Sequence, residues 1–125
     1  MKVKCIQLLN ADGEKVELSS WLTLGQTYHV MAIHISPNGK KKYSIISRQP
    51  PGEWPQIGSH YAECFEIVSE IIPSNWRDWA DSDGERGISP ALWQEDDFQL
   101  KFLNHEPETY AIYEQERNII LREDP

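Results

Sequence analysis

The chain has 125 residues, of which 39% are hydrophobic and 26% are charged, and its formal net charge is −8 at pH 7. This length predicts a single domain over residues 1–125, because it suffices for one hydrophobic core and not for two. No apolar run approaches the roughly 18 residues of a membrane-spanning helix, and the N-terminal residues lack the apolar block of a secretory signal, so we expect a cytoplasmic protein that enters no membrane.

Short apolar runs separated by turn residues characterise residues 1–72. The first run, residues 3–9, is followed by Asp12-Gly13, a dipeptide typical of tight hairpin turns. A second turn, residues 36–42, contains three lysines. Four or five short strands joined by such turns predict an antiparallel meander that closes into a small β-barrel.

The apolar pattern changes parity within residues 28–35. Apolar side chains occupy even positions up to Val30 and odd positions from Ile33 onward. One extra residue near Met31 and Ala32 would bring both halves onto the same face. The sequence therefore predicts a β-bulge there, which is the usual way to curl a strand into a barrel.

Two segments contain many residues that break regular structure. Residues 48–63 are rich in proline and glycine, and residues 71–87 combine proline, glycine and aspartate. Both are predicted to be irregular connections. The second begins the back part of the domain, residues 73–125, for which we expect an irregular segment followed by helices.

Ser89 and Pro90 predict the start of a helix, because serine caps helices and proline favours the first helical position. One straight helix would expose both Phe98 and Phe102. We therefore expect either a break near residues 96–97 or a segment that is buried on two sides.

Pro107 predicts the start of a last helix, which continues over residues 108–121 with one apolar stripe. Glu116 lies within that stripe. Because buried charges are usually paired, we expect its carboxylate to pair with an arginine such as Arg77 or Arg48.

No pattern of residues indicates catalysis, a cofactor or a metal. Cys5 and Cys64 form no CxxC pair and are best explained as buried thiols in a reducing compartment. His60 precedes Cys64 by four residues, but no third group is placed to orient it. The acidic stretch "DSDGERG" resembles a calcium loop without the final glutamate that would bind in bidentate fashion.

Charge and tryptophan point to a protein partner. Residues 1–60 hold seven Lys/Arg and four Asp/Glu, whereas residues 61–125 hold five and sixteen. An acidic surface repels nucleic acids and anionic membranes and attracts basic proteins, and tryptophan is enriched at binding hot spots. An alternative explanation is that the acidic residues only keep the protein soluble and that the tryptophan rings only fill the core, which would give the same composition. The predicted partner-binding residues combine both kinds of side chain: Trp76, Asp78, Trp79, Asp81, Asp83, Glu85, Glu95, Asp96 and Asp97.

Four stretches together carry a resemblance to known proteins: "LTLGQTYHVMAI", "YSII", "CFEIVSEIIPSNW" and the region that starts with "SPALW". They resemble a group of small bacterial proteins similar to the immunity proteins of polymorphic or contact-dependent toxin systems. The resemblance implies an α+β fold, with a small antiparallel SH3-like β-barrel of about four or five strands followed by a pair of C-terminal helices packed on it. It also implies a cytoplasmic protein that neutralises a cognate toxin without catalysis.

Three hypotheses for function follow. In the first, the acidic and tryptophan residues block a basic toxin domain, such as a nuclease, whose nucleic-acid site must be positive. In the second, the protein is an SH3-like adaptor whose groove, lined by Tyr28, Trp54 and Tyr61, binds an extended peptide. In the third, Cys64 and His60 form a catalytic pair.

Overall fold

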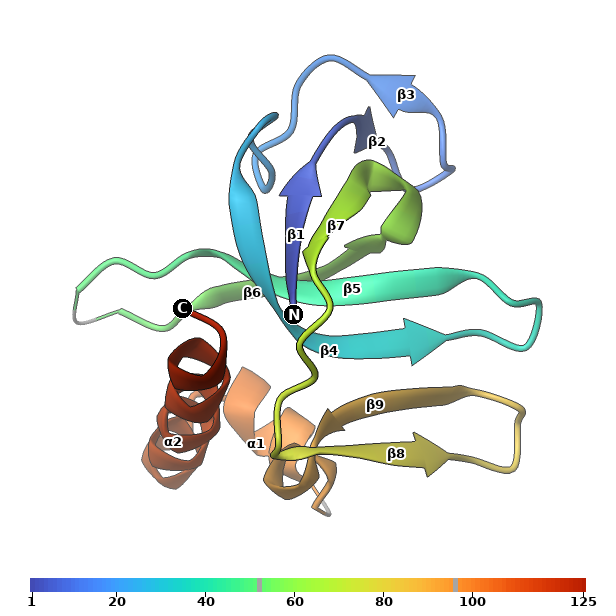
Figure 1. The fold of residues 1–125 in the computed structure, drawn as a ribbon. Coiled ribbons are helices and arrows are strands. Elements are labelled where there is room, and N and C mark those ends of the chain that lie inside the picture. Colours follow the sequence, from blue (N-terminus) through green and yellow to red (C-terminus); the bar gives the residue numbers. More distant parts are fainter. Residues whose placement is uncertain (52, 96) are drawn as a thin grey trace.

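The computed structural model describes residues 1–51, 53–95 and 97–125 and has an α+β fold (Figure 1). A mostly antiparallel sheet is followed by two C-terminal helices. The strands are β1 (Lys2–Cys5), β2 (Leu8–Leu9), β3 (Lys15–Val16), β4 (Thr27–Ile35), β5 (Lys41–Arg48), β6 (Gln56–Tyr61), β7 (Phe65–Ser69), β8 (Trp76–Ala80) and β9 (Arg86–Pro90). The helices are α1 (Phe98–Leu103) and α2 (Pro107–Glu123), with short 3₁₀ helices η1 (Ala62–Cys64) and η2 (Ala91–Gln94).

Strand β4 connects the parts of the sheet, whose main path runs β6-β5-β4-β1-β7. Along one edge of β4, the first half pairs with β1 and the second half pairs with β9. Strand β5 pairs with β4 along the opposite edge. The β4–β5 and β8–β9 hairpins therefore lie side by side and point the same way (Figure 1). No helix in the described residues is long and apolar enough to cross a membrane.

The predicted β-bulge in β4 is confirmed. The register between β4 and β5 shifts between Val30 and Ala32, and both Val30 and Met31 are buried. A bulge bends a strand and increases its twist. Here it separates the half of β4 that pairs with β1 from the half that pairs with β9.

Three hairpin loops share one design. In residues 10–14, 36–40 and 81–85, the first residue's N–H donates to the fifth residue's carbonyl at 2.9 Å. The fourth residue of each loop is a glycine with φ of +81°, +85° and +86°, respectively, a conformation that L side chains rarely adopt. The hairpin turn predicted at Asp12-Gly13 is confirmed.

The prediction of irregular structure in residues 71–87 is wrong, because β8 and the first two residues of β9 lie there and form a hairpin. The sequence signal was present, since Asp83-Gly84 repeats the Asp-Gly of the first loop. Residues 48–63 are also only partly irregular. Pro55 is the last proline of this segment, and β6 begins immediately after it and pairs with β5.

The helix predicted to begin at Ser89-Pro90 is wrong as well. These residues end β9, η2 follows, and α1 begins only at Phe98. The expected break is confirmed at Asp97, whose φ is +63°, whereas Asp96 lies outside the described residues. Because of this break, α1 turns its phenylalanines inward, and Phe98 is buried.

The last helix begins at Pro107 as predicted, but the pairing expected for Glu116 is wrong. Glu116 is buried, and its carboxylate accepts a hydrogen bond of 2.8 Å from Asn75 Nδ2. The Arg77 guanidinium instead donates to the backbone carbonyls of Ser74 and Trp76. A neutral amide therefore takes the place of the expected arginine.

The hydrophobic core is formed mainly by β1, β4, β5 and η1, with Trp76 and Ile120 added from the back part of the chain. Cys5 and Cys64 are buried free thiols, as predicted. At the end of α2, the buried Asp124 carboxylate lies 2.9 Å from the Met1 ammonium and accepts a hydrogen bond of 2.7 Å from Ser69 Oγ. These contacts fasten the end of the chain to β1 and β7.

Candidate partner-binding groove

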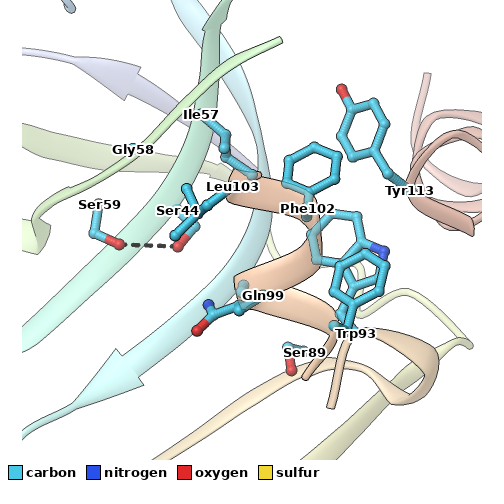
Figure 2. A pocket seen from close by; sticks show the side chains of 12 residues that line it. Ser44, Ile57, Gly58, Ser59, Ser89, Trp93, Gln99, Phe102, Leu103 and Tyr113 are labelled. Atoms are coloured by element: carbon cyan, nitrogen blue, oxygen red, sulfur yellow. Dashed lines mark hydrogen bonds between the residues drawn. The ribbon is translucent and has the colours of Figure 1, made fainter. Parts of the chain in front are cut away.

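A groove runs between the outer face of β4, β5 and β6 and the segment formed by η2 and α1. It has two parts, an inner cavity of about 260 Å³ and an outer depression of about 550 Å³. The two parts are continuous because both are lined by Ala32, Ser44, Ser59, Ser89 and Trp93, among other residues. Figure 2 shows the inner cavity, with Gln99 and Leu103 of α1 directed toward the sheet.

The sheet side of the inner cavity carries small side chains. Ser44 and Ser59 lie opposite each other on β5 and β6, and their hydroxyls form a hydrogen bond of 3.0 Å (Figure 2). Ala32 is the partner of Ser44 on β4. Larger residues at these positions would fill the space that the helical side leaves open.

Stacked aromatic rings form the opposite side. Trp93 stacks on Phe98, Phe98 stacks on Phe102, and the ring centroids are 6.2 and 5.8 Å apart. Phe102 also packs against Tyr113 of α2 at 5.1 Å. Offset contacts of this kind stabilise neighbouring rings beyond the area that they bury. The wall is therefore built from η2, α1 and α2 together.

Two glutamine side chains hold this wall in place. Gln94 donates hydrogen bonds to the Ser89 carbonyl and hydroxyl and to the Arg77 carbonyl, which fixes η2 on the β8–β9 hairpin. Gln49 donates to Tyr110 and accepts from Tyr113, which fixes α2 on the loop before β6. Burial raises the pKa of Tyr113, so its hydroxyl remains the proton donor in the latter bond.

The outer depression is built around Trp79. Trp79, Gly87 and His34 form a row across β8, β9 and β4, and the indole stacks on the imidazole with a centroid distance of 5.8 Å. A Cβ at position 87 would lie 2.9 Å from the indole and would collide with the Ile33 carbonyl oxygen. Only glycine therefore fits at position 87. Glu85, in the loop between β8 and β9, places its carboxylate in contact with His34 Nε2.

The structure brings three of the predicted site residues together. Trp79, Glu95 and Asp97 all line the outer depression, and both carboxylate residues are exposed. Among the described residues that line either part of the groove, none is lysine or arginine. We call this part of the outer depression, where Trp79, Glu95 and Asp97 lie, the mouth of the groove, and its net charge is negative.

The other predicted residues have different places. Trp76 is only 4% exposed and belongs to the core. Asp78 lines a neighbouring depression together with Lys41 and Arg86. Asp81 has a structural use in its loop, because its carboxylate accepts hydrogen bonds from the N–H groups of Asp83 and Glu85 at 2.9 and 3.0 Å. Asp96 lies outside the described residues.

Reasoning from sequence missed the inner cavity. Its sheet side depends on β6, which was predicted to be irregular, although Ile57 and Tyr61 within it are residue types that favour strands. The rings proposed for an adaptor groove are not together: Tyr28 is buried, Trp54 packs on Phe102, and no described pocket is lined by more than one of these three residues.

The environment of Cys64 and His60 does not favour a catalytic pair. Both line a small depression beside β6. Burial raises the pKa of the Cys64 thiol, and burial together with Lys42 lowers the pKa of His60. Both shifts favour the neutral forms, whereas a nucleophilic thiolate requires the opposite. In the described part of the chain, no group of three or more His, Cys, Asp or Glu side chains is arranged to hold a metal ion.

The fold and the groove thus define a small α+β protein with an acidic surface depression. Comparison with protein-family models, with curated proteins and with solved structures finds no match to this chain.

Proposed function

We propose that this protein is a cytoplasmic immunity-type inhibitor, which binds a basic bacterial toxin domain and blocks it without catalysis. The observation that carries the proposal is the mouth of the groove. Glu95 and Asp97 are exposed and line the outer depression together with Trp79, and among the described residues that line the groove there is no lysine or arginine to neutralise them. Exposed carboxylates next to a large aromatic ring suit a positively charged protein surface.

The proposed partner is a toxin that acts on nucleic acid, because such an enzyme needs a positive surface at its active site. An inhibitor that covers this surface competes with the substrate and needs no chemistry of its own. Complementary charge would speed the association and make it sensitive to salt. The same acidic mouth would repel nucleic acid, so the inhibitor would not itself bind the substrate of the toxin.

We also infer that residues 1–72 form an SH3-like barrel. Three features support this. The β2–β3 hairpin lies in the chain between β1 and β4, which pair directly with each other. The bulged β4 is shared between two halves of the sheet, and β7 follows a 3₁₀ helix and returns to pair with β1. In this view β8 and β9 extend the sheet from the second half of β4, and η2 and the helices pack beside the sheet to create the groove.

The test is capture of partners from a lysate of the source organism, with washes at low and then high salt, followed by mass spectrometry. We expect one stoichiometric basic protein that dissociates as salt rises. When expressed alone, that protein should stop growth, and co-expression of the inhibitor should restore it. Many weak partners that survive high salt would contradict the proposal and favour a peptide-binding adaptor.

A further inference from the structure

We propose that the groove is a two-part site for an extended segment of the partner, with a bulky apolar side chain in the inner cavity and a lysine or arginine in the outer depression. This proposal rests on the proposed function, because it assigns the surface through which the basic partner is recognised. It adds a recognition pattern that charge alone does not provide.

The inner cavity has the size and lining for one apolar side chain. Its volume is about 260 Å³, whereas an apolar cavity of about 150 Å³ is enough to bind benzene. Its walls include Trp93, Phe102 and Leu103, and it contains no charged side chain among the described residues that line it. A leucine or phenylalanine of a partner would find apolar contacts there, and a charged group would find no counter-charge.

The rim of the groove also exposes apolar surface. Leu103 lines the inner cavity and is 71% exposed, and Leu100 lines the outer depression and is 61% exposed. Both belong to α1, whose phenylalanines face the core side. Large apolar side chains that remain exposed beside a cavity are typical of interaction surfaces. A chain lying along the groove would cover them.

The outer depression has the opposite character. Glu95 and Asp97 supply two carboxylates to this depression, which Trp79 also lines. Carboxylates form strong charge-assisted hydrogen bonds with guanidinium and ammonium groups. Because the two parts of the groove are continuous, one partner segment can reach both.

Charge also selects the occupant. A second copy of this chain has a net charge of −8, so two copies would repel each other at this acidic mouth. A membrane surface or a nucleic acid carries the same sign and is disfavoured for the same reason. A basic and apolar peptide segment satisfies both parts of the groove.

The test uses the isolated full-length protein and fluorescently labelled Gly/Ser peptides that carry leucine, arginine, both or neither, with the spacing between the two varied. Fluorescence anisotropy at low salt gives the affinities. We expect the best peptide with both residues to bind about tenfold more tightly than either single-residue peptide, because one large apolar side chain is buried in addition to the ionic contact. Equal affinities for all peptides would overturn the proposal.

Variants of the protein separate the contribution of the peptide's leucine from that of its arginine. Ser59→Leu, which fills the cavity, and Leu103→Ala, which trims its rim, should abolish the advantage of leucine and leave the arginine peptide unaffected. The double change Glu95→Gln and Asp97→Asn should do the reverse. Leu18→Ala is the matched control for Leu103→Ala, since Leu18 is 88% exposed and lines no part of the groove. Peptide binding that Ser59→Leu and Leu103→Ala both leave unchanged would overturn the proposal.

The outcomes separate this proposal from the proposed function. If the peptides bind as expected but no basic protein is captured, the two-part site stands and the inhibitor function fails. If a basic toxin is neutralised equally by the wild type and by the Leu103→Ala variant, the function stands and the two-part site fails. A concentration-dependent dimer that Leu103→Ala dissociates would also overturn the proposal, because a second copy would then occupy the groove.

Discussion

The part of the chain from β1 to β7 and the part from β8 to α2 differ in where their side chains lie. The front part supplies most of the core, including the fully buried Val3, Val30 and Ile45. The back part adds few core residues and leaves Leu100 and Leu103 exposed beside the acidic mouth of the groove. The back part, from residue 76 on, also holds thirteen of the twenty acidic residues.

Under the proposed function, this difference assigns stability to the front part and binding to the back part. The front part provides a sheet face with the small side chains Ala32, Ser44 and Ser59, and the back part places aromatic rings and carboxylates on the opposite side of the groove. Substitutions in the front core should therefore change folding, whereas substitutions at the groove rim should change binding alone.

The largest effect is expected in the front core. Ile45→Ala removes a fully buried side chain from β5 and should lower the free energy of unfolding by about 4 kcal/mol, as measured by chemical denaturation. Leu18→Ala, at a site that is 88% exposed, should change it by less than about 0.5 kcal/mol. Similar losses for both variants would contradict the placement of the core.

Asp124 tests the connection between the two parts. Asp124→Asn removes the carboxylate that Met1 and Ser69 contact and should lower the free energy of unfolding by about 3 kcal/mol, because it leaves the buried Met1 ammonium without its counter-charge, with the neutral Ile71 carbonyl still accepting a hydrogen bond from it. Glu114→Gln, on the exposed side of α2, is the control. Equal stability of the two variants would show that this contact does not hold α2 to the sheet.

The same residue predicts a dependence on pH. Burial alone would raise the pKa of Asp124, but the hydrogen bond from Ser69 and the contacts with the Met1 ammonium and Lys2 lower it overall. The contribution of Asp124 to stability is therefore complete above the pKa of an aspartate in an unfolded chain, about 4, and is lost as the pH falls through the lower pKa of the folded state. Stability curves measured on acidification should show this loss in the wild type and lack it in Asp124→Asn.

Gly87 tests whether the β8–β9 hairpin sits on β4 as described. Gly87→Ala forces a Cβ against the Ile33 carbonyl and the Trp79 ring, and it should lower the free energy of unfolding by about 2 kcal/mol. It should also shift the fluorescence of Trp79. Gly13→Ala in the first loop meets no neighbouring atom and should cost only about 1 kcal/mol, from its positive φ. A smaller cost at Gly87 than at Gly13 would contradict the pairing.

The smallest effect on stability is expected at the mouth of the groove. Glu95 and Asp97 are exposed, so Glu95→Gln and Asp97→Asn together should change the free energy of unfolding by less than about 0.5 kcal/mol. Asparagine tolerates the left-handed conformation of position 97, so the turn is preserved. A large loss in thermal or chemical stability would mean that these carboxylates support the fold.

Local sequence rules predicted the features that depend on neighbouring residues. The parity change predicted the bulge near Met31, Asp12-Gly13 predicted a hairpin turn, and Pro107 predicted the start of α2. The same rules failed where long-range pairing decides. Strand β6 is stabilised by β5, and Ser89-Pro90 ends a strand because β8 pairs with it.

The candidate site was only partly predictable for the same reason. Trp79, Glu95 and Asp97 were expected from composition, but their approach to one another depends on the missed β8–β9 hairpin. The inner cavity needs contacts between β6 and α1, which are distant in sequence. No pattern within either segment shows that Ser59 and Leu103 line the same space.

The most direct test of the central claim compares matched charge variants in partner capture. The wild type, the Glu95→Gln/Asp97→Asn variant and a Glu66→Gln/Glu70→Gln control on and beside β7, which removes the same charge away from the groove, are used with one lysate at low salt. We predict that the wild type and the control recover the same basic protein in stoichiometric amount, and that the groove variant recovers at least about tenfold less. Equal recovery by all three proteins would contradict the assignment of the groove as the binding surface.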